Sequence, residues 1–238
     1  MKKLLLAWVA ITTIIVAGSA CAADRGGQTK GPEAAFSWTG GHIGINAGLA
    51  NGHTSWKDPV PIGGNIDATP AGRTAHTDMS GGIYGVQGGY DWQFDNWVVG
   101  LEGSFSALTL SGTNIDQFNH DWTLRAKTEW IGSLTGRVGW AVRHVLLYGR
   151  GGVAWAHNKF EIEDVNTFRG SPSATRVGFV VGAGFEWAFA PGWSVFSEAG
   201  YDGFHSRNVT FSAPPEPSFD VRTRETIETL RFGVNFRF

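Results

Sequence analysis

Cysteine is almost absent from this sequence: among 238 residues there is one, Cys21. We expect the segment that contains it to be removed, so disulfide bonds cannot stabilise the mature chain. Charged residues are also scarce, at 17 % of the chain. After residue 17 no stretch offers the roughly 18 consecutive apolar residues of a membrane-spanning helix. These absences exclude a disulfide-stapled domain and a helical membrane protein.

The N-terminus has the three parts of a secretory signal peptide. Lys2 and Lys3 precede an apolar run at residues 4–17, which ends in small residues. Cleavage after Ala22 gives the expected organisation: signal peptide 1–22, periplasmic lead-in 23–37 and barrel 38–238. The alternative is a lipoprotein acylated at Cys21, although Gly18 stands where lipid-modifying peptidases favour an aliphatic residue.

The charge of the mature chain argues against a nucleic-acid partner. Removal of Lys2 and Lys3 leaves 17 of the 19 basic residues against 21 acidic residues, a net charge of −4. Nucleic-acid binding draws most of its affinity from excess basic residues. The abundant residues are 34 glycines and 11 tryptophans, a combination typical of a sheet whose aromatic residues meet a bilayer.

Apolar and polar residues alternate with a period of two through most of the chain, which indicates β-strands with two different faces. In residues 145–155 the alternation is poor, so a strand is expected there without assigned faces. Eight strands are expected, at about residues 38–49, 84–94, 97–105, 124–140, 145–155, 177–189, 193–202 and 230–238.

Short and long connections alternate between these strands. The short ones are turns at residues 95–96, 143–144 and 191–192, and the long polar ones are residues 51–79, 109–121, 157–174 and 204–222. The sequence therefore predicts an all-β fold: an eight-stranded antiparallel transmembrane β-barrel with short periplasmic turns and long extracellular loops.

A soluble barrel with an apolar interior would show the same alternation. The polar face favours the membrane barrel because its charges stand beside many glycines, as in a narrow wet lumen. These lumen charges either line a pore or pair with one another, and we favour internal pairs because buried unpaired charge is costly. They are Glu102, Arg137, Arg176, Glu186, Glu198 and Arg231.

Aromatic residues flank all three short turns, which indicates a periplasmic aromatic girdle. The alternative is that they belong to an ordinary core. The residues concerned are Trp92, Phe94, Trp97, Trp140, Trp187, Phe189 and Trp193.

No catalytic, cofactor or metal site is expected. His205 and Ser206 are adjacent, and neighbours on a strand point to opposite faces, which disfavours a nucleophile pair. The seven histidines lack metal-ligand spacing, although a haem or metal contact at the outer loops stays open.

Several motifs resemble the small OmpA-like outer-membrane family of alpha-proteobacteria: residues 129–133, 136–140 and 147–154, and the terminal Phe238. The resemblance implies an eight-stranded barrel, a surface antigen and, in some members, porin or haemin-binding activity. It also implies that the assembly machinery recognises the C-terminal strand, a role carried here by Phe236, Arg237 and Phe238.

From these observations we expect a structural and surface-interaction barrel in the bacterial outer membrane. The expected partners are outer-membrane lipid, lipopolysaccharide, the assembly machinery and host or environmental ligands at the outer loops. A small porin with weak diffusion-pore activity and a haemin-binding surface protein are the alternatives, and a barrel enzyme acting on lipid A is the least favoured.

Overall fold

The computed structural model describes residues 36–57, 74–115, 122–164, 169–170, 173–213 and 216–238. The predicted signal peptide and most of the predicted lead-in lie outside these residues. Nearly the whole described chain is strand: β1 Gly40–Lys57, β2 Thr74–Phe94, β3 Trp97–Ile115, β4 Trp122–Val142, β5 Val145–Asp164, β6 Arg169–Gly170, β7 Ser173–Ala190, β8 Trp193–Ala213 and β9 Glu216–Arg237.

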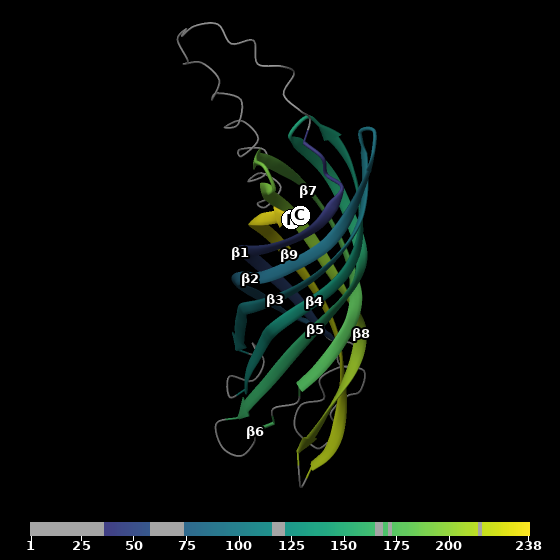
Figure 1. The fold of residues 1–238 in the computed structure, drawn as a ribbon. Helices are drawn as coiled ribbons and strands as arrows, with labels where there is room; N and C mark the ends of the chain where they lie inside the picture. Colours follow the sequence, from purple (N-terminus) through teal and green to yellow (C-terminus); the bar gives the residue numbers. More distant parts are fainter. Residues whose placement is uncertain (1–35, 58–73, 116–121, 165–168, 171–172, 214–215) are drawn as a thin grey trace, which may run out of the picture. The chain divides into compact units, whose positions relative to one another are not determined.

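The eight long strands form one closed antiparallel sheet. Each pairs with its neighbours along the chain, and β1 pairs with β9 from His42↔Arg237 to Lys57↔Arg222, which joins the two ends of the sheet. Figure 1 shows these strands tilted around a common interior, as closure of a small barrel requires. The two-residue strand β6 pairs only with β5 among the described residues. The predicted eight-stranded barrel is confirmed.

Three tight turns connect the strands at one end of the barrel, which we call the turn end. They occupy the predicted positions after β2, β4 and β7. Asp95, Arg143 and Gly192 take positive φ values of 53°, 54° and 74°, a conformation that lets a very short connection reverse an antiparallel strand. The opposite end is called the loop end. No helix in the described part of the chain has the length and apolar character that a membrane crossing needs.

The predicted bounds of the long loops are wrong, because the strands continue far into them. β1 and β2 stay paired to Lys57↔Thr74, and β8 and β9 to Ala213↔Glu216. Polar residues are frequent near the loop end and interrupt the apolar alternation that marks a strand in sequence. The hydrogen bonds between strands do not depend on that alternation and hold the sheet together beyond it.

The outward face carries a band of exposed apolar side chains on every long strand. On β1 the exposed fractions of Ile43, Ile45 and Leu49 are 57 %, 65 % and 63 %. The next outward residues on the same strand are polar: Asn51 and His53. An apolar band of this extent is far larger than the patches that soluble monomers expose to water, and it is the surface that a bilayer covers.

The inward face is more apolar than the sequence pattern predicts. β5 shows the order of layers from the turn end: Leu146 and Tyr148, then Arg150, then Ala154 and Ala156. The cluster at the turn end is Trp38, Val98, Ala141, Leu146, Tyr148 and Ala188. The cluster nearer the loop end is Ala50, Met79, Ile83, Leu108, Leu110, Ile131, Ala154, Ala156, Val180, Phe204 and Ile227. A charged layer lies between them.

Trp38 departs most clearly from expectation. It was expected to begin the first strand, but β1 begins at Gly40 and Trp38 is fully buried inside the barrel. Gly40 has a φ of +144° and a Cβ there would lie 2.6 Å from the carbonyl oxygen of Phe238. Glycine therefore allows the chain to bend from the strand into the interior at this point.

Candidate functional site

The most chemically distinctive part of the molecule is the charged layer inside the barrel. All six predicted lumen charges point inward and are buried, five of them in this layer and Arg176 nearer the loop end. Sequence reasoning did not count several charged or titratable residues that the structure adds to the interior: His42, Asp91, Arg150, Asp202, Glu225 and Arg237. Most of them stand an even number of residues from another inward residue on the same strand, so the alternation could have predicted that they point inward.

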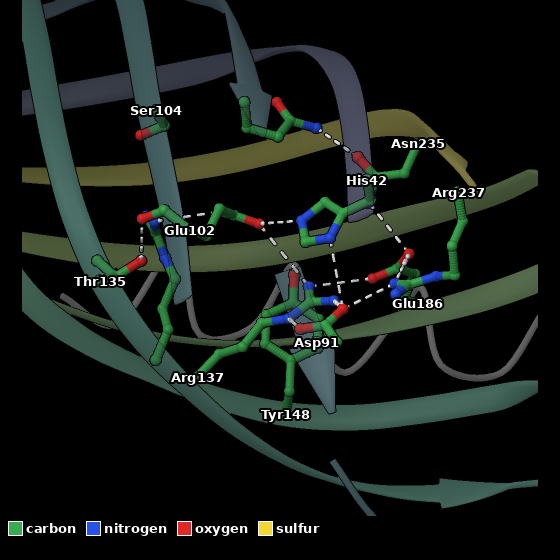
Figure 2. A network of polar contacts seen from close by, with 12 residues as sticks. His42, Asp91, Glu102, Ser104, Thr135, Arg137, Tyr148, Glu186, Asn235 and Arg237 are labelled. Carbon is green, nitrogen blue, oxygen red and sulfur yellow. Dashed lines mark hydrogen bonds and ion pairs between the residues drawn. The ribbon is translucent and has the colours of Figure 1, made fainter. Parts of the chain in front are cut away.

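Arg137 of β4 stands at the centre of the half of the layer nearest the turns. Its Nε donates to Asp91 Oδ1 at 2.7 Å and its Nη2 donates to Asp91 Oδ2, so the two side chains form a bidentate pair. Its Nη1 donates to Glu186 Oε2 at 3.2 Å, and Tyr148 lies under the guanidinium, 5.3 Å from it. These side chains come from β2, β4, β5 and β7, and Figure 2 shows them pointing toward one another. A planar guanidinium suits such multiple contacts better than a lysine would.

His42 of β1 and Arg237 of β9 extend this half of the network. The imidazole lies between two carboxylates, with Nδ1 3.4 Å from Asp91 Oδ2 and Nε2 3.3 Å from Glu102 Oε2 (Figure 2). Arg237 Nη2 is 2.8 Å from Asp91 Oδ2. Asp91 therefore joins three cationic or imidazole groups from three strands.

Glu198 of β8 is the centre of the other half. Arg150 Nε lies 3.0 Å from its Oε1, Arg231 donates to the same oxygen, and the Tyr148 hydroxyl donates to Oε2 at 3.1 Å. Asp202, also buried, lies two inward positions further along β8, beyond Gly200. Tyr148 contacts both Arg137 and Glu198, so it joins the two halves.

Neutral amides fill the space beside the ions. Asn46 Nδ2 donates to Gln87 Oε1 at 2.6 Å, and Gln87 Nε2 donates to Asn235 Oδ1 at 2.7 Å. The void left among Gln87, Arg137, Glu198 and their neighbours measures about 10 Å³, the space for a single water molecule. Acids and bases thus pair with one another across this layer, where side chains leave little free space, as expected for the narrow interior of an eight-stranded barrel.

A second buried polar cluster lies nearer the loop end, beyond the larger apolar cluster. Its acid is Glu225 of β9, which accepts a hydrogen bond from Thr128 Oγ1 at 3.0 Å and another from Asn158. The predicted lumen charge Arg176 donates to Thr223 in the same cluster. The interior therefore alternates apolar and polar layers along the barrel.

The seven aromatic residues of the predicted girdle all point outward beside the turns. Their exposed fractions run from 40 % for Trp140 to 63 % for Phe94. Trp97 and Trp140 meet edge to face with ring centroids 4.9 Å apart. Such amphipathic rings suit a membrane interface.

A second outward aromatic group lies nearer the loop end, and sequence reasoning missed it. Trp130 stacks on His157 with centroids 5.7 Å apart, and Phe105 lies 5.6 Å from Trp130. On the neighbouring strands β7 and β8, Phe179 and Tyr201 are 6.1 Å apart. A signal existed, because these residues share the outward parity of the first group on the same strands.

The three C-terminal residues separate by face. Phe236 packs 5.0 Å from Trp193 on the outer surface, and Phe238 is 74 % exposed. Arg237 points inward between them and is buried in the network. The predicted set is therefore contiguous in sequence but contains two lipid-facing rings and one interior charge.

Outside the barrel interior, histidines gather near the loop end. His53 Nδ1 is 2.6 Å from Asp78 Oδ1, and the His53 ring stacks on His76. Among the described residues no group of three or more histidine, cysteine, aspartate or glutamate side chains has the arrangement to hold a metal ion. His205 and Ser206 are both exposed, next to a bulge between Phe204 and Arg207, and His120 lies outside the described residues.

Comparison with known proteins gives consistent results. A family model described as an outer membrane protein beta-barrel domain matches residues 12–238. The 31 kDa outer-membrane immunogenic protein of Brucella melitensis is 31 % identical over 246 residues, and the match covers 100 % of both chains. The 22 kDa outer membrane protein of Rhizobium leguminosarum bv. viciae is 31 % identical over 165 residues, 69 % of this chain and 70 % of that one.

Among solved structures, the outer membrane protease OmpT from Escherichia coli has a similar fold. The TM-score is 0.55 at 10 % identity, covering 89 % of this chain and 100 % of that chain. At this identity the likeness concerns the fold alone.

Proposed function

The chain belongs to the outer membrane protein beta-barrel domain family, and from that premise we propose that its barrel is sealed and serves as a structural support for an outer, surface-interacting rim. The protein is an integral protein of the outer membrane, where lipid and lipopolysaccharide surround its apolar band. In such barrels the short turns face the periplasm. The turn end is then periplasmic and the loop end faces outside.

The packed charged layer is the observation that carries the proposal. Each half of the charged layer has an arginine beside at least one carboxylate, and an apolar cluster lies on either side of the layer. A solute would have to separate these buried pairs and enter apolar layers, and both steps are energetically costly. This arrangement supports a closed barrel over the porin alternative.

Conductance across planar bilayers tests the sealed interior. We expect no stepwise conductance from the wild-type protein, from Arg150→Ala, which thins the charged layer, or from Leu147→Ala, which trims the lipid-facing side of the same strand. Wild-type steps that change size in Arg150→Ala but not in Leu147→Ala would show a path through the interior and contradict the proposal.

We propose that the rim near the loop end makes the contacts with the surroundings. The paired strands continue past the apolar band there, with outward polar residues such as Asn51, Asp78 and His53. The Brucella relative is named an immunogenic outer-membrane protein, which suits a surface presented outside the cell.

Single cysteines at Ser55 and Asn96 test the orientation: a membrane-impermeant maleimide should label the first in intact cells and the second only after lysis.

We also propose that the protein is not an enzyme, a view that its outer-membrane relatives and the mutual pairing of its interior charges support. Lipid A deacylation and peptide cleavage by the purified barrel are the direct assays. Turnover that disappears in His205→Ala, while the protein stays folded, would contradict this part of the proposal.

The assembly signal is proposed for the outward rings of β9. Phe236 and Phe238 are accessible from the lipid side at the periplasmic end, where assembly machinery would meet them. Their contribution to folding is limited, because burying an aromatic ring contributes about 1.5–3 kcal/mol.

A further inference from the structure

Arg237 faces a different environment from the two phenylalanines that flank it. Its side chain is almost completely buried, whereas Phe236 and Phe238 are exposed on the outer surface. A residue buried inside the closed barrel is not accessible to assembly machinery that approaches from the lipid side. Its contacts therefore need an explanation of their own.

Those contacts join the last strand to the chain that precedes the first strand. Arg237 Nη1 donates to the carbonyl oxygen of Trp38 and lies 3.5 Å from that of Gly40. The guanidinium also lies over the Trp38 ring, 5.4 Å from its centroid. Its Nη2 reaches Asp91 at 2.8 Å, so the same side chain ties Trp38 to the charged layer.

Trp38 is held from the other side by β2 and by the apolar cluster. Its backbone N–H donates to Gln93 Oε1 at 2.8 Å, and Phe36 packs edge-on with ring centroids 4.8 Å apart. The indole is fully buried against residues of β3, β4, β5 and β7. It therefore occupies the turn end of the interior and covers the charged layer there.

The position of these contacts coincides with the end of the seam between β1 and β9. The pairing of the two strands stops at His42↔Arg237, and one further backbone bond runs from Phe238 N to Gly41 O at 2.9 Å. Beyond that point the contacts between the two ends of the sheet involve the side chain of Arg237. The contacts between Trp38 and Arg237 form only when β9 has reached β1.

We propose that Trp38 and Arg237 form a latch that locks the closed barrel at its periplasmic end. In this inference, which rests on the proposed assembly role of Phe236 and Phe238, the terminal strand divides its tasks by face. The outward rings of Phe236 and Phe238 bind the assembly machinery, and the inward Arg237 holds β9 against β1 once the barrel has closed. The inward-bent Trp38 segment is the other half of the latch.

The test compares full-length Arg237→Gln, Trp38→Ala, the double variant and a chain without Phe238. Insertion rate into vesicles that contain purified assembly machinery reports delivery. The unfolding rate in urea, followed by loss of the fast-migrating unboiled form, reports closure. We expect Arg237→Gln and Trp38→Ala to insert at the wild-type rate but to unfold on the order of ten- to a hundredfold faster. The first variant loses the hydrogen bond from the charged guanidinium to the Trp38 carbonyl oxygen, and the second loses the buried indole that lies against the guanidinium.

The double variant distinguishes a latch from two independent structural residues. If the two side chains act together, Arg237→Gln combined with Trp38→Ala should accelerate unfolding by less than the product of the two single accelerations. Multiplicative acceleration in the double variant would overturn the proposal. So would an insertion defect in Arg237→Gln equal to that caused by removing Phe238. Neither result bears on whether the interior conducts, which the conductance assay decides separately.

Discussion

Replacing Arg137 with glutamine should destabilise the barrel strongly, because it leaves several carboxylates without their shared cation. The Arg137 side chain is 2 % exposed and lies within ion-pair distance of Asp91, Glu186 and Glu102. Removing one partner of a buried ion pair typically costs about 3–5 kcal/mol. Glutamine has about the right length but can neither carry the charge nor repeat the bidentate contact.

The contacts that the carboxylates keep in Arg137→Gln determine where the loss of stability falls within that range. Asp91 keeps Arg237 at 2.8 Å, and Glu186 keeps hydrogen bonds from Ser194 and Asn235. Because both carboxylates are partly compensated, we expect the lower end, about 3 kcal/mol. That loss corresponds to a change on the order of a hundredfold in the ratio of folded to unfolded protein.

The assay is urea titration of protein refolded into lipid vesicles, with folded fraction measured by gel migration without boiling. Arg143→Gln is the matched control, since this arginine lies exposed in the turn that follows the same strand, and it should change stability by less than about 0.5 kcal/mol. Arg137→Lys keeps the charge but cannot make the bidentate contact, so its urea midpoint should fall between those of the two glutamine variants. Equal urea midpoints for Arg137→Gln and Arg143→Gln would refute the reasoning.

Three further outcomes are expected. Val181→Arg, in the middle of the outward band of β7, should lose about 2–4 kcal/mol in vesicles, whereas Thr175→Arg, outward but beyond the band on the same strand, should change the urea midpoint little. Removing Phe238 should lower the amount of assembled barrel in cells far more than it lowers the urea midpoint in detergent; unchanged assembly would argue against a recognition role. Trp140→Ala should cost roughly 1–3 kcal/mol in vesicles, because it loses interface burial and the edge contact with Trp97, and an unchanged urea midpoint would contradict a girdle function.

The outward face was readable from the sequence because a single physical rule governs it. Every residue that meets hydrocarbon must be apolar, and strand geometry places such residues two apart, as at Ile43, Ile45 and Leu49. Closure follows from the same medium, since unpaired backbone groups cannot persist in lipid. The positions of the tight turns followed from the pairs of turn-forming residues between these runs, Asp95-Asn96, Arg143-His144 and Pro191-Gly192.

The sequence predicts the interior only in part, because several combinations of side chains can fill it. An inward position can hold a charge, a glycine or an apolar residue, provided that its neighbours across the barrel complement it. Leu110 and Ile227, both fully buried inside, interrupt the polar face for this reason. Partners such as Gln87 and Asn235, which are 148 residues apart, meet only after closure.

The sequence by itself determined the membrane-facing pattern, the strand number and the inward parity of the charges, because each depends on local spacing or on contact with a uniform medium. Only the tertiary structure decided which acid meets which base, how far the strands run past the bilayer, and that Trp38 bends inward to meet Arg237. These features depend on contacts across the closed barrel, between residues as much as 199 positions apart, and no local pattern encodes such a pairing.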